Sequence, residues 1–339
     1  MTEFKLIAID TSKHVFTLHG IDERGGTVLR RELRRSQVEG FFQKQPATEV
    51  VLEACGGSHH WGRRLTALGH RVRLLPPQYV KPFVRRGKND RIDAEAIAEA
   101  AMRPNINPVP VKSVETQAQT MVLSVRELLV KQRTQLVNAL RGHATEFGLI
   151  AAKGTCNVTK LLETIAADPA VPACAQAMFV ELGESIAAVA ARISDLDREL
   201  ARQHKSNQLS QQLAQVPGIG PLSALTLALT IDPAQFQSGR HFAAWLGLTP
   251  KEHSTGGKQR MGGISRQGNE RLRQLLVLGA TSVVKVAKPG RKSASAWLLG
   301  LLARKPRKVV AVALANKMAR IVWAMMTSGE AYRSQPVAA

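Results

Sequence analysis

The chain is poor in cysteine. Its 339 residues include three, Cys55, Cys156 and Cys174. The number is odd, and the spacing matches neither a disulfide framework nor a zinc knuckle. Because structural disulfides belong to oxidising compartments, we expect the protein to work in the reducing cytoplasm.

The sequence also lacks a long apolar run. A membrane-spanning helix needs about 20 consecutive, mostly apolar residues, and not even about 18 occur together here. The start of the chain does not show the charged, apolar and small-residue regions of a signal peptide. We therefore expect neither secretion nor a membrane partner.

Acidic residues are scarce relative to basic ones. The chain has 26 acidic and 47 basic residues, which gives a net charge of +21. The excess is uneven, because residues 1–150 carry a net charge of +8, residues 151–250 of −1 and residues 251–339 of +14. Binding to a nucleic-acid backbone is the first explanation for such a charge, and an anionic membrane surface is a weaker one.

An alternation of apolar runs and helical patterns predicts an α/β domain at the start of the chain. The segments FKLIAID, VFTLHG and GGTVLRREL have the length and composition of three consecutive strands. The pattern then predicts a helix over 36–43, a strand over 49–54, a helix over 59–68, a strand over 72–75 and a helix over 88–101. The order β-β-β-α-β-α-β-α indicates an initial meander followed by parallel crossovers.

Four carboxylates occupy the ends of these elements. Asp10 ends the first strand and Glu53 the fourth, while Asp90 and Asp93 share one face of the helix that Asn89 is placed to cap. Groups that perform chemistry gather beyond the carboxyl ends of strands in open α/β sheets. Carboxylates there can hold Mg²⁺ together with substrate phosphate. The alternative is that these acids are turn formers and a favourable first helical turn.

Basic residues surround the predicted acidic helix. Arg85, Arg86 and Lys88 directly precede it, which predicts a surface for a polyanion. His59 and His60 follow Glu53 closely, but a zinc site would need further ligands at suitable spacing. We interpret these two histidines as the start of a helix.

The middle of the chain predicts long helices. Apolar residues recur at helical spacing over 113–148 and again over 178–203. In the second stretch Ile186, Ile193 and Leu200 are part of a seam typical of a coiled coil, so self-association and core packing both remain open. We predict a first domain over 1–150, a helical or coiled-coil connector over 151–208, a mainly helical domain over 209–330 and a tail over 331–339.

Two glycine-containing segments follow the connector. The segment LAQVPGIGPLSAL predicts a helix-hairpin-helix whose Gly218 and Gly220 let backbone N–H groups approach a phosphate, although a plain turn also uses such residues. The later segment KEHSTGGKQRMGGISRQGNERLRQLL predicts a flexible, cationic loop. Its Ser254 is either a nucleophile or incidental to a phosphate-binding loop formed with Lys258, Arg260 and Arg266.

Five motifs together resemble the DEDD-type insertion-sequence transposases of the insertion-sequence-110 kind, a family that includes the Piv-type DNA invertases. They are IAIDTSKH, VVLEACGG, KNDRIDAEAIAE, VPGIGPLSA and GLTPKEHSTGGKQRMGGISRQGNERLR, and they span nearly the whole chain in the order of the family. The resemblance implies a RuvC-like, RNase H-like domain whose Asp10, Glu53, Asp90 and Asp93 bind Mg²⁺ or Mn²⁺.

The resemblance further implies a helical transposase domain with a serine that joins covalently to DNA. This serine corresponds to Ser254, with Thr255 as the neighbouring alternative. The implied partners are donor DNA, target DNA and a structured guide RNA encoded by the element. The resemblance also implies a homo-oligomer, either a dimer or a tetramer. The expected location is the bacterial cytoplasm, in association with the nucleoid.

Two other functions remain open from the residues. A RuvC-like nuclease or Holliday-junction resolvase would use the same acids to activate water and would form no covalent adduct with DNA. A non-catalytic nucleic-acid-binding protein would use the acids only in turns and helix caps.

Overall fold

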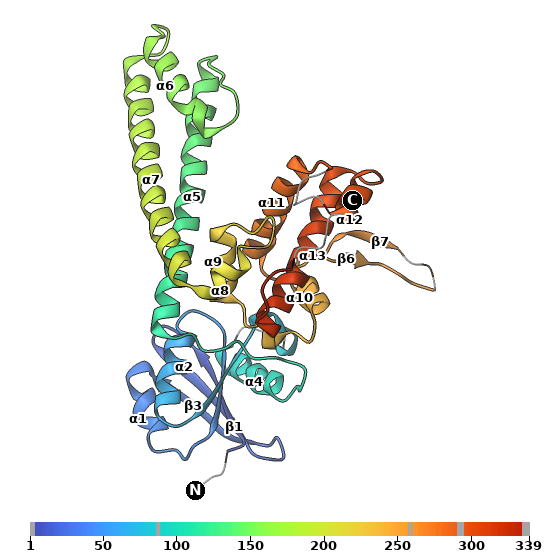
Figure 1. The fold of residues 1–339 in the computed structure, drawn as a ribbon. Helices are drawn as coiled ribbons and strands as arrows, with labels where there is room; N and C mark the ends of the chain where they lie inside the picture. The colour runs from blue at the N-terminus through green and yellow to red at the C-terminus, as the bar shows by residue number, and fades with distance from the viewer. Residues whose placement is uncertain (1–3, 86–88, 257, 259, 290–294, 334–339) are drawn as a thin grey trace. The chain divides into compact units, whose positions relative to one another are not determined.

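The structure is a computed structural model that describes residues 4–85, 89–256, 258, 260–289 and 295–333 (Figure 1). It divides into two compact units, Met1–Gln117 and Ala118–Ala339. Each unit is described by itself. The predicted four-part division at 150, 208 and 330 stays a prediction.

The first unit is built on a five-stranded sheet with the order β3-β2-β1-β4-β5. The strands are β1 (Leu6–Thr11), β2 (Val15–Ile21), β3 (Thr27–Arg34), β4 (Glu49–Glu53) and β5 (Arg71–Leu75). β1, β2 and β3 are antiparallel neighbours, whereas β4 pairs in parallel with both β1 and β5. This confirms the predicted meander followed by parallel crossovers.

Helices cover both faces of this sheet (Figure 1). On one face, α1 (Val38–Phe42) and α2 (Ser58–Ala67) pack on Ile7, Ile9 and Leu52. On the other, α4 (Asp90–Ala101) packs its alanines and Ile97 on Ala8 and Val51. The shorter segments are η1 (Arg35–Gln37), α3 (Pro77–Val80) and η2 (Lys81–Phe83). The predicted helix over 36–43 is therefore split, with a 3₁₀ turn before α1.

The second unit begins with two long helices, α5 (Val114–Glu146) and α7 (Ala173–Ser206), connected through η3 (Thr155–Asn157) and α6 (Val158–Ala167) (Figure 1). The predicted seam of α7 is buried within the chain. Ile186 packs with residues of α5 and α6, and Leu200 packs with residues of α5 and α9. The core-packing alternative therefore accounts for these positions.

The remaining elements form a helical body with one hairpin. In chain order they are α8 (Gln208–Leu213), α9 (Pro221–Thr230), η4 (Pro233–Gln235), α10 (Gly239–Trp245), β6 (Pro250–Glu252), β7 (Met261–Ile264), α11 (Glu270–Val286), α12 (Ala296–Leu302) and α13 (Arg307–Ser328). Phe242, Leu276 and Met318 are among the side chains of its core. The sequence did not predict the β6–β7 hairpin, because its glycines and charges do not alternate as in a strand.

Two helices are long and apolar enough to cross a membrane by length and composition, α7 and α13. The sequence argument, which counted uninterrupted apolar residues, did not find them. Both contribute side chains to helical cores, such as Ile186 and Met318. A core helix of a soluble protein passes the same composition test.

Candidate metal centre and serine loop

Three carboxylates converge in the first unit. Oxygen atoms of Asp10, Asp90 and Asp93 all lie within 4.8 Å of one another. Asp10 lies on β1, and the other two lie in the first turn of α4, where the Asn89 side chain accepts a hydrogen bond of 3.0 Å from the Arg91 N–H. Asn89 therefore caps α4, as predicted. Because the helix begins at Asp90, its first turn places Asp90 and Asp93 beside Asp10 of β1.

Glu53 is not among the three carboxylates that meet within 4.8 Å, but the register of the sheet places it on the same face as Asp10. Ile9 pairs with Leu52 across the parallel β1 and β4, so Asp10 and Glu53 follow on neighbouring strands. Successive side chains of a strand point to opposite faces. Ile9 and Leu52 point to the face of α2, so Asp10 and Glu53 point to the face that α4 covers.

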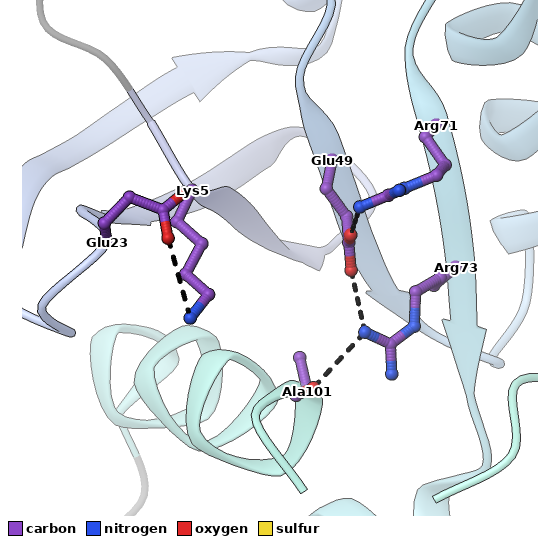
Figure 2. A network of polar contacts seen from close by, with 6 residues as sticks. All are labelled: Lys5, Glu23, Glu49, Arg71, Arg73 and Ala101. Atoms are coloured by element: carbon purple, nitrogen blue, oxygen red, sulfur yellow. Dashed lines mark hydrogen bonds and ion pairs between the residues drawn. The ribbon is translucent and has the colours of Figure 1, made fainter. Parts of the chain in front are cut away.

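A polar network ties the far end of α4 to the sheet (Figure 2). Arg73 on β5 donates one hydrogen bond of 2.7 Å to Glu49 on β4 and another of 3.2 Å to the carbonyl of Ala101. Arg71 also pairs with Glu49, and Lys5 forms a separate ion pair of 3.9 Å with Glu23. Because Ala101 ends α4, this network helps to fix the helix that carries the acids.

The electrostatics of the cluster are unfavourable for four negative charges. Burial, together with the charges of Asp93, Asp90 and Glu53, raises the pKa of Asp10 to about 6. Burial also raises the pKa of Glu53, with a contribution from Asp93. All four predicted acids therefore interact in the folded unit, and a cation between them would relieve their repulsion.

The donor atoms fit a hard divalent cation. The cluster offers carboxylate oxygens, which Mg²⁺ and Mn²⁺ prefer, and no thiolate or imidazole is part of it.

His59 lies inside α2, as predicted, and its Nδ1 accepts a hydrogen bond of 3.2 Å from the Lys112 N–H. Burial lowers the pKa of His59, and the charges of Lys112 and Arg63 add to that effect.

Basic side chains lie close to the acidic helix. Arg85 is exposed and forms an ion pair of 3.5 Å with Glu95. Exposed pairs of this kind contribute about 0–1 kcal/mol, so a phosphate can replace the carboxylate at little cost. Arg86 and Lys88, predicted as nucleic-acid-binding residues, lie outside the described residues.

Ser254 lies in the loop of the β6–β7 hairpin, where it is exposed. Its hydroxyl donates a hydrogen bond of 2.8 Å to Glu252 Oε1 and accepts a longer one of 3.3 Å from the Arg260 N–H. Within the described chain, the Thr255 hydroxyl makes no hydrogen bond, although the Thr255 carbonyl accepts one from the Lys258 N–H. Ser254 therefore contacts a carboxylate and Thr255 does not.

Sequence reasoning missed Glu252. Glu252 ends β6 and Ser254 follows two residues later in the loop, so an acid so close in sequence to a candidate nucleophile is a signal that could have found it. Lys258 and Arg260 are exposed in the same loop. Arg266 follows β7 with a positive φ of 57°.

The two predicted glycines differ in their surroundings. Gly218 has a positive φ of 93° and packs on α11, where a Cβ added to Gly279 would lie 1.8 Å from the Gly218 carbonyl oxygen. The close approach of the turn to α11 therefore explains why glycine stands at position 218. Gly220 is exposed directly before Pro221, the first residue of α9, and a Cβ there would meet no atom.

Comparisons with known proteins identify the family of the chain. Residues 7–148 match the DEDD transposase family of the IS110 type, and residues 210–295 match the family described as "Transposase IS116/IS110/IS902 family". The y4pF/y4sB protein of Sinorhizobium fredii, which carries the name of a transposase, is 53% identical over 329 residues, 96% of this chain and 85% of its own length.

Two further relatives are named for insertion sequences. The transposase for insertion sequence element IS1111A of Coxiella burnetii is 38% identical over 98% of this chain and 92% of its own. The transposase for IS1328 of Yersinia enterocolitica is 36% identical over 98% of this chain and 99% of its own. The chain therefore belongs to the IS110/IS116/IS902 family of DEDD transposases.

Proposed function

We propose that this transposase cleaves and rejoins DNA strands through a covalent bond between Ser254 and a DNA phosphate, assisted by metal at the acidic cluster. The observation that carries most weight is the convergence of three carboxylates within 4.8 Å from two separate segments of the chain. A structural role alone does not require like charges this close, because they destabilise the fold.

Asp10, Glu53, Asp90 and Asp93 would hold Mg²⁺ or Mn²⁺. When bound, such an ion stabilises negative charge on the oxygens of a phosphate that undergoes displacement. The acids themselves would place the scissile phosphate at the end of β1. Arg85, Arg86 and Lys88 would bind the neighbouring phosphates of the strand.

The proposed covalent step uses Ser254, Glu252 and a water molecule. Ser254 Oγ forms a bond to phosphorus, the bond from phosphorus to the leaving DNA oxygen breaks, and that oxygen takes a proton from water. The hydroxyl proton of Ser254 passes to Glu252, which already accepts a hydrogen bond from it at 2.8 Å. In the reverse step, the hydroxyl of another strand attacks phosphorus and gives its proton to the hydroxide left by the first step. The bond from phosphorus to Ser254 Oγ breaks, and Oγ takes its proton back from Glu252.

The partners of this reaction are donor DNA, target DNA and a structured guide RNA. Exchange between two duplexes needs several active sites, so we propose a homo-oligomer, a dimer or a tetramer.

Gly220 at the start of α9 would contact a phosphate through the exposed helix N-terminus, with Gly218 shaping the turn. Lys258, Arg260 and Arg266 would neutralise phosphates beside Ser254. The expected location is the cytoplasm, at the nucleoid.

The decisive experiment traps the covalent intermediate. Purified protein is incubated with a nicked DNA substrate and Mg²⁺ and then resolved on a denaturing gel. Ser254→Ala should still bind DNA and form no adduct, whereas Thr255→Ala should form the adduct as the unchanged protein does. Normal cleavage and joining by Ser254→Ala would refute the nucleophile assignment.

A second candidate is a nuclease or junction resolvase that activates water. It is favoured by one observation: the acidic cluster is complete within the first unit without any residue of the serine loop. This enzyme would cut DNA in the presence of metal and leave no protein-bound DNA in the same gel, with either variant.

A further inference from the structure

A large groove runs along α13 in the second unit. It has a volume of about 1400 Å³, and α10, the β6–β7 hairpin, the start of α12 and α13 line it. This volume exceeds the roughly 300–1,000 Å³ of sites that enclose a small molecule. We call it the α13 groove.

The charged residues of the α13 groove are all basic. They are Arg240, Arg266, Lys308, Lys317 and Arg320, and its lining includes no acidic residue. None of these five forms an ion pair within the described parts of the chain. Uncompensated positive charges in a concave surface attract a polyanion.

Most of the rest of the lining is apolar, and it includes an exposed tryptophan. Trp297 is 40% exposed, and the Lys317 ammonium lies 4.6 Å from the centre of its ring. Val309 is 53% exposed at one end of the groove. An exposed indole beside cationic groups suits a base together with its phosphate, because bases stack on aromatic rings while the backbone follows a basic surface.

Two polar side chains stabilise the walls. Trp323 donates a hydrogen bond of 3.2 Å to the Pro233 carbonyl, and Asn316 donates one of 3.2 Å to the Leu248 carbonyl. These bonds connect α13 to the segments before α10 and before β6. These connections between the walls do not use the basic groups of the groove.

Arg266 provides an independent observation. Its φ of 57° is the one positive φ among the described residues other than glycine. A side chain in this conformation is strained, and such strain is typical of functional sites. Glycine adopts the same conformation freely, so the presence of arginine at a wall of the groove indicates a use for its charge.

We propose that the α13 groove binds an unpaired segment of nucleic acid, with phosphates on its basic side chains and a base against Trp297. A duplex would present phosphates but would keep its bases away from the apolar wall. The inference rests on the proposed function only in that the strand would come from the guide RNA or from a DNA strand released during exchange.

The test measures binding of full-length protein to fluorescent oligouridylate, oligothymidylate and a duplex of equal length, without divalent metal. Trp297→Ala should weaken single-strand binding about 10-fold, as loss of one stacked base does, and Trp297→Phe should restore most of it. Duplex binding should be unchanged. A preference for oligouridylate would identify RNA as the source of the strand, and one for oligothymidylate would identify DNA.

Arg266→Gly tests the charge without harming the fold, because glycine relieves the positive φ. It should reduce single-strand affinity and lower the slope of log affinity against log salt by about 0.7, whereas Trp297→Ala should leave this slope unchanged. Lys160→Gln, an exposed change on α6, is the charge-matched control and should bind as the unchanged protein. Thermal melting confirms that each variant is folded.

The outcomes separate this inference from the proposed function. Unchanged single-strand binding in both Trp297→Ala and Arg266→Gly would overturn the groove assignment, as would an equal loss of duplex binding in Trp297→Ala. Asp10→Asn should bind oligouridylate normally and fail to cleave DNA. If Asp10→Asn cleaves normally, the proposed function fails whatever the groove binds.

Discussion

At the scale of single residues, the acidic cluster opposes the stability of its own unit. Asp10 is half-buried among three other carboxylates, and its pKa of about 6 reflects burial first and those neighbouring charges second. A divalent cation that binds only the folded unit would convert this repulsion into stabilisation.

Asp93→Asn should separate stability from activity. Removing one charge relieves repulsion, so the metal-free protein should become more stable by about 0.5 kcal/mol, while DNA cleavage is lost and DNA binding stays nearly intact. Thermal melting with and without Mg²⁺, together with a cleavage assay, checks both parts. Glu23→Gln, in an exposed turn, is the control. Intact cleavage in Asp93→Asn would remove the metal site from the mechanism.

Glu252→Gln tests the proposed proton acceptor. The amide keeps the shape of Glu252 and can still accept a hydrogen bond from Ser254, but it cannot take the proton. The rate of adduct formation should fall about 100-fold or more, since general bases contribute about 10²–10⁴-fold. Glu270→Gln on α11 should leave the rate unchanged. An unchanged rate in Glu252→Gln would assign the proton to another acceptor.

At the scale of elements, the position of α4 depends on Arg73, Glu49 and the Ala101 carbonyl (Figure 2). Burial by itself would raise the pKa of Glu49, but hydrogen bonds from Arg73 and Arg71 outweigh it and hold this pKa below its ordinary value. The ionised form is therefore favoured in the folded state. Its contribution is present above the pKa of the unfolded chain and is lost as pH falls through the lower folded pKa.

Glu49→Gln should destabilise the first unit at pH 7 by about 1.5–3 kcal/mol, the range for a hydrogen bond to a charged group. The difference from the unchanged protein should shrink as pH falls below about 4.3, where free glutamate becomes protonated. Hydrogen exchange of the backbone amides of β4 and β5 measures this loss of stability in the intact chain. Glu99→Gln removes an exposed pair with Arg103 and should have a much smaller effect. If the amides of β4 and β5 exchange equally slowly in Glu49→Gln and Glu99→Gln, the network of Arg73, Glu49 and the Ala101 carbonyl does not stabilise the first unit.

Two helical glycines should respond in opposite ways to alanine. Gly279→Ala on α11 would place a Cβ 1.8 Å from the Gly218 carbonyl oxygen, so the backbone must shift and stability should fall by about 1–3 kcal/mol. Gly142→Ala on α5 meets no atom and should raise helix stability by about 0.5–1 kcal/mol. Urea unfolding of both variants measures the difference. A stabilising Gly279→Ala would mean that α11 and the turn at Gly218 do not approach this closely.

At the scale of the whole molecule, positive charge is concentrated in the last quarter of the chain, with a net charge of +14 over residues 251–339. The hairpin loop lies in this part, as do four of the five basic residues of the α13 groove, with Arg240 as the fifth on α10. Its charge is therefore positioned to bind phosphates, beyond any contribution to solubility.

Binding of duplex DNA should depend steeply on salt. If six or more phosphates are neutralised, affinity should fall about 1,000-fold or more between about 50 and 200 mM salt, because condensed counterions are released on binding. Anisotropy titrations over this range measure the slope. A fall of less than about 10-fold would show that most of the excess charge does not contact phosphates.

By itself, the sequence determined the order of strands and helices along the first unit, the cap at Asn89 and the place of each of the four acids at the end of an element, because these follow from local periodicity and from residues adjacent in the chain. Tertiary structure decided which face of the sheet Asp10 and Glu53 share with α4, since that depends on strand register. It also decided that the seam of α7 packs inside the chain, that Ser254 contacts Glu252 and that Trp297 lies beside Lys317. Such contacts depend on how distant elements pack, and the periodicity of a single segment contains no information about its packing partner.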